Sequence, residues 1–237
     1  MGRVVFGLKE LYGLVSALTV MMVLWIFVTP STLYLGFTAP PQVPTAHPIN
    51  KYRGHLSVVL LHQFPAGIWS LLVPVQLFTP LRKSFPTIHR ICGYVFFATV
   101  PLITAGVFLI FHRKLDFEFG PSELGLSPFT NSGYFLKVFI SILGIYFLLT
   151  AMIALKRARE KSYDDHFKWV VRHLASGIWV APLRIYSSLR RPTTLLQAKS
   201  AFYDGTLMSI VLTLTAGELF LLYYNQSPTR KVANKKN

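Results

Sequence analysis

Long runs of apolar residues alternate with short polar stretches along the whole chain. A helix that crosses a bilayer needs about 20 mostly apolar residues, and the runs reach that length repeatedly. The predicted membrane spans are residues 11–28, 56–78, 91–111, 134–155, 167–189 and 202–224. The pattern predicts an all-α, polytopic membrane protein, a six-transmembrane-helix bundle in which residues 1–237 form a single transmembrane domain.

The composition agrees with this interpretation. Only 14% of the 237 residues are charged, against about 25% in ordinary soluble domains. The first run is longer than the apolar core of a usual signal peptide, and no small-residue cleavage site precedes Pro30. We therefore expect residues 11–28 to be a retained helix and the lipid bilayer to surround the protein.

The net charge of +15 would suggest a nucleic-acid partner in a soluble protein. Here the Lys and Arg residues lie between apolar runs, and no basic stripe alternates with stacking aromatic residues, so we expect no nucleic-acid partner. Most of these cations fall on the side of the membrane that carries both termini, which predicts cytosolic termini, or the equivalent in an organelle. The host membrane is not identified, and the single Cys92 cannot form an internal disulfide.

Proline residues interrupt three of the predicted spans. Pro65 and Pro74 lie in the second span, Pro101 in the third and Pro182 in the fifth. Because proline lacks an N–H group, it leaves a backbone carbonyl without its helical partner. At membrane depth that carbonyl needs a partner inside the protein. We therefore expect these three helices at the centre of the bundle.

Histidines and arginines collect on the same three spans. His166, His173 and Arg184 share one face of the fifth span, because their spacings are close to whole helical turns. Ionisable groups at membrane depth are costly unless they are paired or functional. We therefore predict two ion pairs, one between Arg172 and Glu218 and one between Arg184 and Asp204. The candidate cofactor-binding residues are His62, His89, Arg90, His166, Arg172, His173 and Arg184.

The second and fifth spans share a short motif and run in opposite directions. It is a histidine followed by glycine-isoleucine-tryptophan, at His62 and Gly67-Ile68-Trp69 and again at His173 and Gly177-Ile178-Trp179. Paired motifs on oppositely directed helices are typical of inverted repeats, which place a binding site between the two halves. The motif favours a three-plus-three inverted repeat.

The order of several polar motifs resembles a known family. The motifs are His62, Gln76, Pro86-x-x-His89-Arg90-x-x-Gly93-Tyr94, His166-x-x-Trp169-x-x-Arg172 and Leu183-Arg184. From Lys51 to about Leu189 the chain resembles the predicted membrane proteins grouped as domain of unknown function 2306. The resemblance implies a multi-pass membrane protein and no particular activity. The layout is also similar to cytochrome b561 and ferric-reductase membrane proteins.

Three functional hypotheses remain open. The first is transmembrane electron transfer through haem b, with His62, His89, His166 or His173 as iron ligands, arginines on the propionates and a redox partner. The second is a proton-coupled transporter in which His62 and His173 titrate. The third is an accessory membrane subunit that binds an anionic lipid headgroup or a quinone. In a fourth, structural interpretation the histidines only hydrogen-bond backbone carbonyls, and the sequence does not decide whether the chain is an enzyme.

Overall fold

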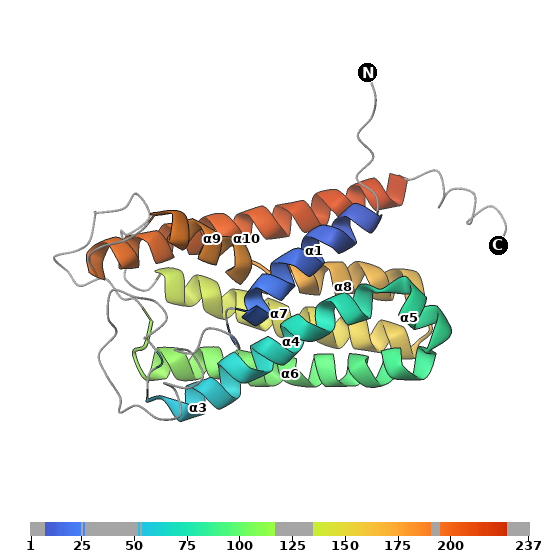
Figure 1. Ribbon diagram of the computed structural model, residues 1–237, viewed down its shortest axis with the longest axis horizontal. Coiled ribbons are helices and arrows are strands. Elements are labelled where there is room, and N and C mark those ends of the chain that lie inside the picture. The colour runs from blue at the N-terminus through green and yellow to red at the C-terminus, as the bar shows by residue number, and fades with distance from the viewer. Residues whose placement is uncertain are drawn as a thin grey trace, which may run out of the picture.

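The computed structural model describes residues 8–24, 26, 52, 54–116, 135–190 and 195–226. All regular structure in these ranges is helical, and Figure 1 shows helices running back and forth along the long axis of an elongated bundle. The elements in chain order are α1 (Leu8–Val23), α3 (Leu56–Val58), the π-helical segment η3 (Val59–Gln63), α4 (Phe64–Leu77), α5 (Thr79–Ser84), α6 (Pro86–His112), α7 (Phe135–Arg159), α8 (Tyr163–Gly177), α9 (Val180–Arg190) and α10 (Leu195–Gln226).

Four of the predicted spans are confirmed as helices long and apolar enough to cross a membrane. They are Leu56–Leu77, Pro86–His112, Phe135–Arg159 and Lys199–Gln226. In the described part of the chain, α1 has 16 residues and is shorter than these crossings. The multi-pass character is therefore supported, but the count of six spans and the inverted repeat are not confirmed.

The fifth predicted span is not one continuous helix, which corrects the prediction for residues 167–189. α8 ends at Gly177 and α9 begins at Val180. The cause lies in Pro182, which has no N–H group for the carbonyl of Ile178. That carbonyl accepts a 2.9 Å hydrogen bond from Ala181 instead, so the chain makes a tight turn between the two helices.

The second predicted span contains a different irregularity. The five residues of η3, Val59–Gln63, form a π-helical turn between α3 and α4. Pro65, the second residue of α4, cannot donate to the carbonyl four residues before it. A widened turn at this point lets the chain continue as α4 without that bond. Single π-helical turns inside longer helices are frequent at functional sites.

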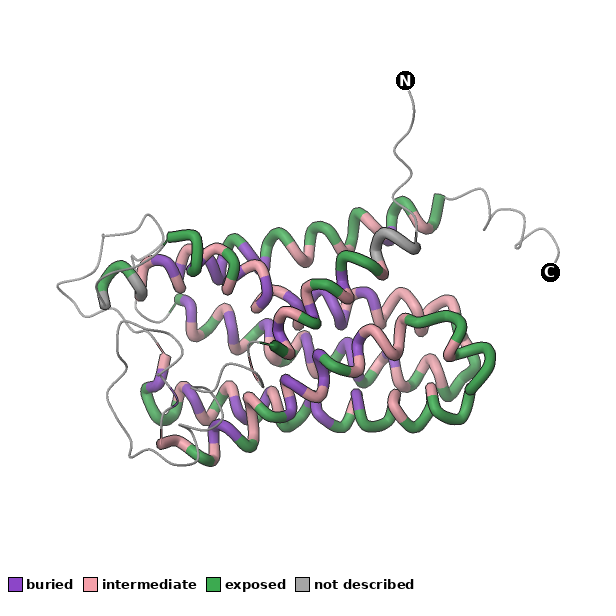
Figure 2. Tube along the Cα trace, viewed as in Figure 1, coloured by how far each residue is buried: buried purple, intermediate pink, exposed green. Residues whose placement is uncertain are grey.

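The buried core contains residues of α4, α6 and α8, where the prolines predicted the centre, and also residues of α1 and α7. Trp69 of α4 stacks on Phe96 of α6, with 5.4 Å between ring centroids. Phe147 of α7 and Leu174 of α8 belong to the same buried cluster, so α7 also takes part in the centre. Figure 2 shows that buried positions, in purple, recur along the helices of the bundle.

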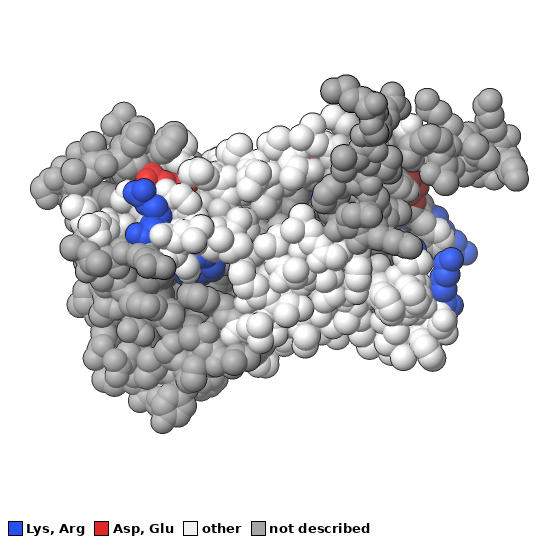
Figure 3. All heavy atoms as spheres, turned by 45° about the horizontal axis from the view of Figure 1, so that its top comes forward, with Lys and Arg blue, Asp and Glu red and all other residues white. Residues whose placement is uncertain are grey.

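The outer surface of the bundle is strongly apolar along its middle. Large aliphatic side chains such as Ile91, Ile142 and Leu212 are exposed on the bundle. On the face shown in Figure 3, charged side chains gather towards the two ends and the broad middle carries none. An apolar belt between charged ends is the surface that a bilayer requires.

Candidate functional site

A cavity of about 140 Å³ lies inside the bundle, between α1, the η3–α4 helix, α6, α7 and the α8–α9 pair. Both helix irregularities border it, because Gln63 of η3 and Trp179 of the α8–α9 turn line its wall. Irregular backbone at membrane depth occurs where it is buried in protein or lines a cavity. The polar side chains in the lining are Tyr52, His62, Gln63, Thr104, Ser176 and Arg184.

The η3 turn directs His62 and Gln63 to the cavity. The Nδ1 atom of His62 lies 3.2 Å from the carbonyl oxygen of Ile103 on α6. This contact depends on Gly106, because a Cβ there would lie 2.6 Å from the Cβ of His62 and 2.9 Å from its backbone nitrogen. The glycine therefore lets η3 pack directly against α6.

The α8–α9 turn supplies the opposite wall. Gly177 fits closely against aromatic side chains, because a Cβ at this position would lie 2.8 Å from Phe147 and 2.9 Å from Trp69. Trp179 and Arg184 follow and line the cavity. A glycine is thus required beside each of the two helix irregularities, Gly106 next to η3 and Gly177 next to the α8–α9 turn.

Arg184 brings a positive charge to the cavity, next to Tyr52. Tyr52 is buried, and its burial raises the pKa of the phenol. The positive charge of Arg184 lowers this pKa, and the negative charge of Asp116 raises it. Tyr52 is therefore a neutral hydroxyl group at physiological pH. Asp204, the partner predicted for Arg184, accepts a 3.3 Å hydrogen bond from Ser200 on its own helix, and the ion pair with Arg184 stays a prediction.

In the cavity wall, Oε1 of Gln63 and Oγ1 of Thr104 are buried and have no hydrogen-bond partner within the described part of the chain. A buried polar atom without a partner costs about 1–3 kcal/mol, and most such atoms in proteins are satisfied. The residues that carry these two atoms line the cavity, although the atoms themselves are buried in its wall.

His173 lies beside this site and is held by hydrogen bonds on both ring nitrogens. The indole N–H of Trp69 donates to Nε2 at 3.0 Å, and Nδ1 lies 3.1 Å from the carbonyl oxygen of Phe147. An indole can only donate, so Nε2 is unprotonated and Nδ1 carries the hydrogen. His173 is fully buried and acts as a neutral link between α4, α7 and α8.

His89 and His166 belong to another region, at the end of the bundle that carries α5. The ring of His166 bonds the carbonyl of Ala154 at 2.8 Å, and Gln76 donates to the carbonyl of His89 at 3.2 Å. His166 precedes the predicted span; burial lowers the pKa of its imidazole, the Ala154 hydrogen bond opposes this, and Arg82 lowers it further. Arg90 is exposed nearby. None of these residues lines the central cavity.

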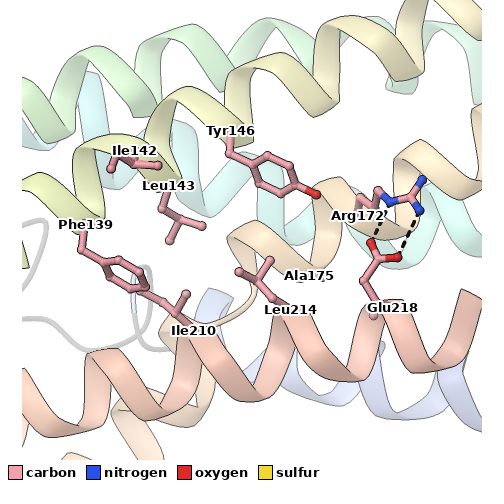
Figure 4. A pocket seen from close by; sticks show the side chains of 10 residues that line it. Phe139, Ile142, Leu143, Tyr146, Arg172, Ala175, Ile210, Leu214 and Glu218 are labelled. Carbon is pink, nitrogen blue, oxygen red and sulfur yellow. Dashed lines mark hydrogen bonds and ion pairs between the residues drawn. The ribbon is translucent and has the colours of Figure 1, made fainter.

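The predicted ion pair between Arg172 and Glu218 is confirmed. Nε of Arg172 donates to Oε1 of Glu218 at 2.7 Å and Nη2 donates to Oε2 at 3.0 Å, which makes the contact bidentate. Figure 4 shows the pair between α8 and α10. It lies in a second, outward-facing hollow.

Of the seven candidate residues, His62 and Arg184 are the ones that line the central cavity.

Sequence reasoning missed Tyr52, Gln63 and Thr104. Tyr52 precedes a span and reads as an interfacial aromatic residue, and the other two are ordinary polar residues in apolar helices. Pro65 was the one available signal, because it marks the disturbed turn that presents Gln63.

Haem binding stays a prediction, and the described part of the chain places its candidate ligands in different surroundings. An axial ligand needs an unprotonated ring nitrogen facing the iron, and Nε2 of His173 is occupied by Trp69. His89 and His166 lie away from the cavity, in another part of the bundle. No group of three or more His, Cys, Asp or Glu residues is placed to hold a metal ion within the described ranges.

Fold and surface together define an all-helical, multi-pass membrane protein with a small polar cavity inside its bundle. A family model described as "Predicted membrane protein (DUF2306)" matches residues 59–221, and the chain belongs to this family. No curated protein and no solved structure matches the chain. The matched region includes both helix irregularities and the cavity residues from His62 to Arg184.

Proposed function

We propose that the protein binds the ring head group of a quinone-type lipid in the central cavity. The observation that carries the proposal is that two helix irregularities meet at a ring-sized cavity with unsatisfied polar atoms. An engineered protein cavity of about 150 Å³ holds one benzene molecule, and the cavity here measures about 140 Å³. A single six-membered ring therefore matches the available space.

The polar atoms of the wall suit both oxidation states of such a ring. A quinone presents carbonyl oxygens, which accept hydrogen bonds from the Arg184 guanidinium and the Thr104 hydroxyl. A quinol presents hydroxyl groups, which can donate to Oε1 of Gln63. Trp69, Phe147 and Trp179 supply the aromatic surface that a flat ring packs against.

This proposal follows one of the alternatives that the sequence left open. Haem binding stays a prediction from the sequence, and the hydrogen bonds on His173 argue against that residue as an iron ligand. Proton-coupled transport likewise stays a prediction. It would depend on His62, since His173 is enclosed by its hydrogen bonds.

Binding can be measured by quenching of tryptophan fluorescence with a short-chain benzoquinone added to the purified protein. Trp69 and Trp179 line the cavity, so a bound quinone should quench both. The blocking variant is Gly144→Leu, because a Cβ at Gly144 meets only the methyl of Thr104, at 3.8 Å, and a longer side chain can extend into the cavity. The control is Gly13→Leu on α1, where a Cβ meets nothing within 4 Å.

We expect saturable quenching in the natural protein and in Gly13→Leu, and its loss in Gly144→Leu with unfolding temperature unchanged. Equal saturable quenching in all three proteins would show that the quinone binds elsewhere. Quenching that rises linearly with concentration would show only partitioning into the detergent, and either result would reject the proposal.

A further inference from the structure

A second hollow, of about 260 Å³, opens on the outside of the bundle between α7, α8 and α10. Figure 4 shows it from close by, with apolar side chains along its length and the Arg172–Glu218 pair at one end. We call it the outer groove. Its apolar side chains include Phe139, Ile142, Leu143, Ala175, Ile210 and Leu214.

The groove faces the lipid rather than the interior. Ile142 on its rim is 60% exposed, and Leu212 on α10 is exposed to the same degree. α7 and α10 both contain candidate membrane spans. Glu218 lies eight residues before the end of α10 at Gln226, about 12 Å at a rise of 1.5 Å per residue. With the end of α10 at the membrane surface, the ion pair lies at the depth of the acyl chains.

A half-exposed ion pair at this depth needs a polar neighbour. The side chain of Glu218 is 51% exposed, and charged groups facing hydrocarbon are unfavourable. The pair uses Nε and Nη2 of Arg172, so Nη1 does not take part in it. The hydroxyl of Tyr146 points towards the same end of the groove (Figure 4). Hydrogen-bond donors and a carboxylate acceptor therefore both border the outer groove.

The charges decide the class of ligand. Arg172 and Glu218 neutralise each other, so the groove has no net charge to attract an anionic or cationic headgroup. A group that both donates and accepts hydrogen bonds complements the pair, and a hydroxyl group does so without bringing a charge into hydrocarbon. We propose that the outer groove binds one uncharged lipid alcohol, with its hydroxyl at Arg172 and Glu218 and its apolar chain along Ile142 and Ile210.

This site is separate from the central cavity, although Leu143 lines both. The probe is a photoreactive diacylglycerol added to the purified full chain in lipid nanodiscs, with labelled peptides identified by mass spectrometry. The comparison probe is the matched photoreactive phosphatidic acid, which differs by one phosphate. Ile142→Trp fills the groove, and Ile145→Trp is the control on the same helix, because Ile145 is 51% exposed and does not line the groove.

We expect diacylglycerol to label α7 and α10 more strongly than phosphatidic acid does, and to lose this labelling in Ile142→Trp but not in Ile145→Trp. Glu218→Gln should weaken binding by about tenfold, as expected for a hydrogen bond to a charged group. Equal labelling by the two probes, or equal labelling of the two tryptophan variants, would mean that the groove holds bulk lipid. Cross-links between two copies through α10 would mean that a second chain covers it, and each of these results would overturn the proposal.

Discussion

At the scale of single residues, the hydrogen bond between Trp69 and His173 depends on the packing of the whole bundle. It joins side chains 104 positions apart in the sequence, and both are buried. Phe147 packs on the imidazole at 4.3 Å between ring centroids. Trp69 donates the hydrogen bond to Nε2 of His173, so removing the indole leaves this buried nitrogen unsatisfied.

Trp69→Phe should therefore destabilise the protein. The phenyl ring retains part of the packing on Phe96, but Nε2 of His173 loses its donor in a buried setting, which costs about 1–3 kcal/mol. The change is measured by unfolding in detergent, with Trp179→Phe as the control because it removes an indole next to the cavity without touching His173. An unfolding free energy equal to that of the natural protein would mean that this hydrogen bond is unimportant.

Thr104 gives a prediction that separates binding from structure. Its hydroxyl has no partner, so Thr104→Val should leave the stability unchanged or slightly higher. The same change removes a donor from the cavity and should weaken quinone binding by about threefold to tenfold, for a hydrogen bond of roughly 0.5–1.5 kcal/mol. Unfolding and fluorescence quenching are measured on the same sample. Lower stability with unchanged binding would assign the hydroxyl a structural role.

At the scale of elements, the irregular turns at Val59–Gln63 and Ile178–Trp179 account for the position of the cavity. The sequence predicted disturbed helices at Pro65 and Pro182, but not that one would become a π-helical turn and the other a break. That choice depends on which carbonyls find partners after packing. Gly106 and Gly177 contribute to that packing, because both allow contacts that a Cβ would prevent.

Gly106→Ala should disrupt the η3 side of the site. The new Cβ would meet backbone atoms of His62 at 2.9 Å, which cannot move as a flexible side chain does, and overpacking of this kind costs about 1–3 kcal/mol. Gly144→Ala is the matched control, because its Cβ has only an ordinary contact at 3.8 Å and alanine favours a helix by roughly 0.5–1 kcal/mol. Comparable stability of the two variants would contradict the close packing of η3 on α6.

At the scale of the whole molecule, the apolar runs predicted the helices well. Four spans have the required length and apolar character, because bilayer thickness constrains them directly. The Arg172–Glu218 pair was predicted for a similar reason, since opposite charges at one depth must meet. The cavity was not predictable, because Tyr52, Gln63 and Thr104 come from separate segments and only the packed bundle brings them together.

The orientation of the chain gives a further prediction. In a background with Cys92→Ala, single cysteines replace the exposed residues Ser84, Glu160 and Arg113. Ser84→Cys and Glu160→Cys lie at turns next to basic residues, so an impermeant maleimide should reach both from the cytosolic side and Arg113→Cys from the opposite side. Labelling is compared in intact cells and inverted vesicles. Labelling of all three positions from one side would contradict the multi-pass arrangement.

The most direct test of the account is photolabelling of the purified protein with a short-chain azidobenzoquinone, followed by mapping of the labelled residues. The account predicts labels at the cavity wall, on η3 and the α8–α9 turn, that disappear with excess unlabelled quinone and in Gly144→Leu. Labels confined to the outer surface, or labels that unlabelled quinone does not displace, would contradict a quinone site inside the bundle.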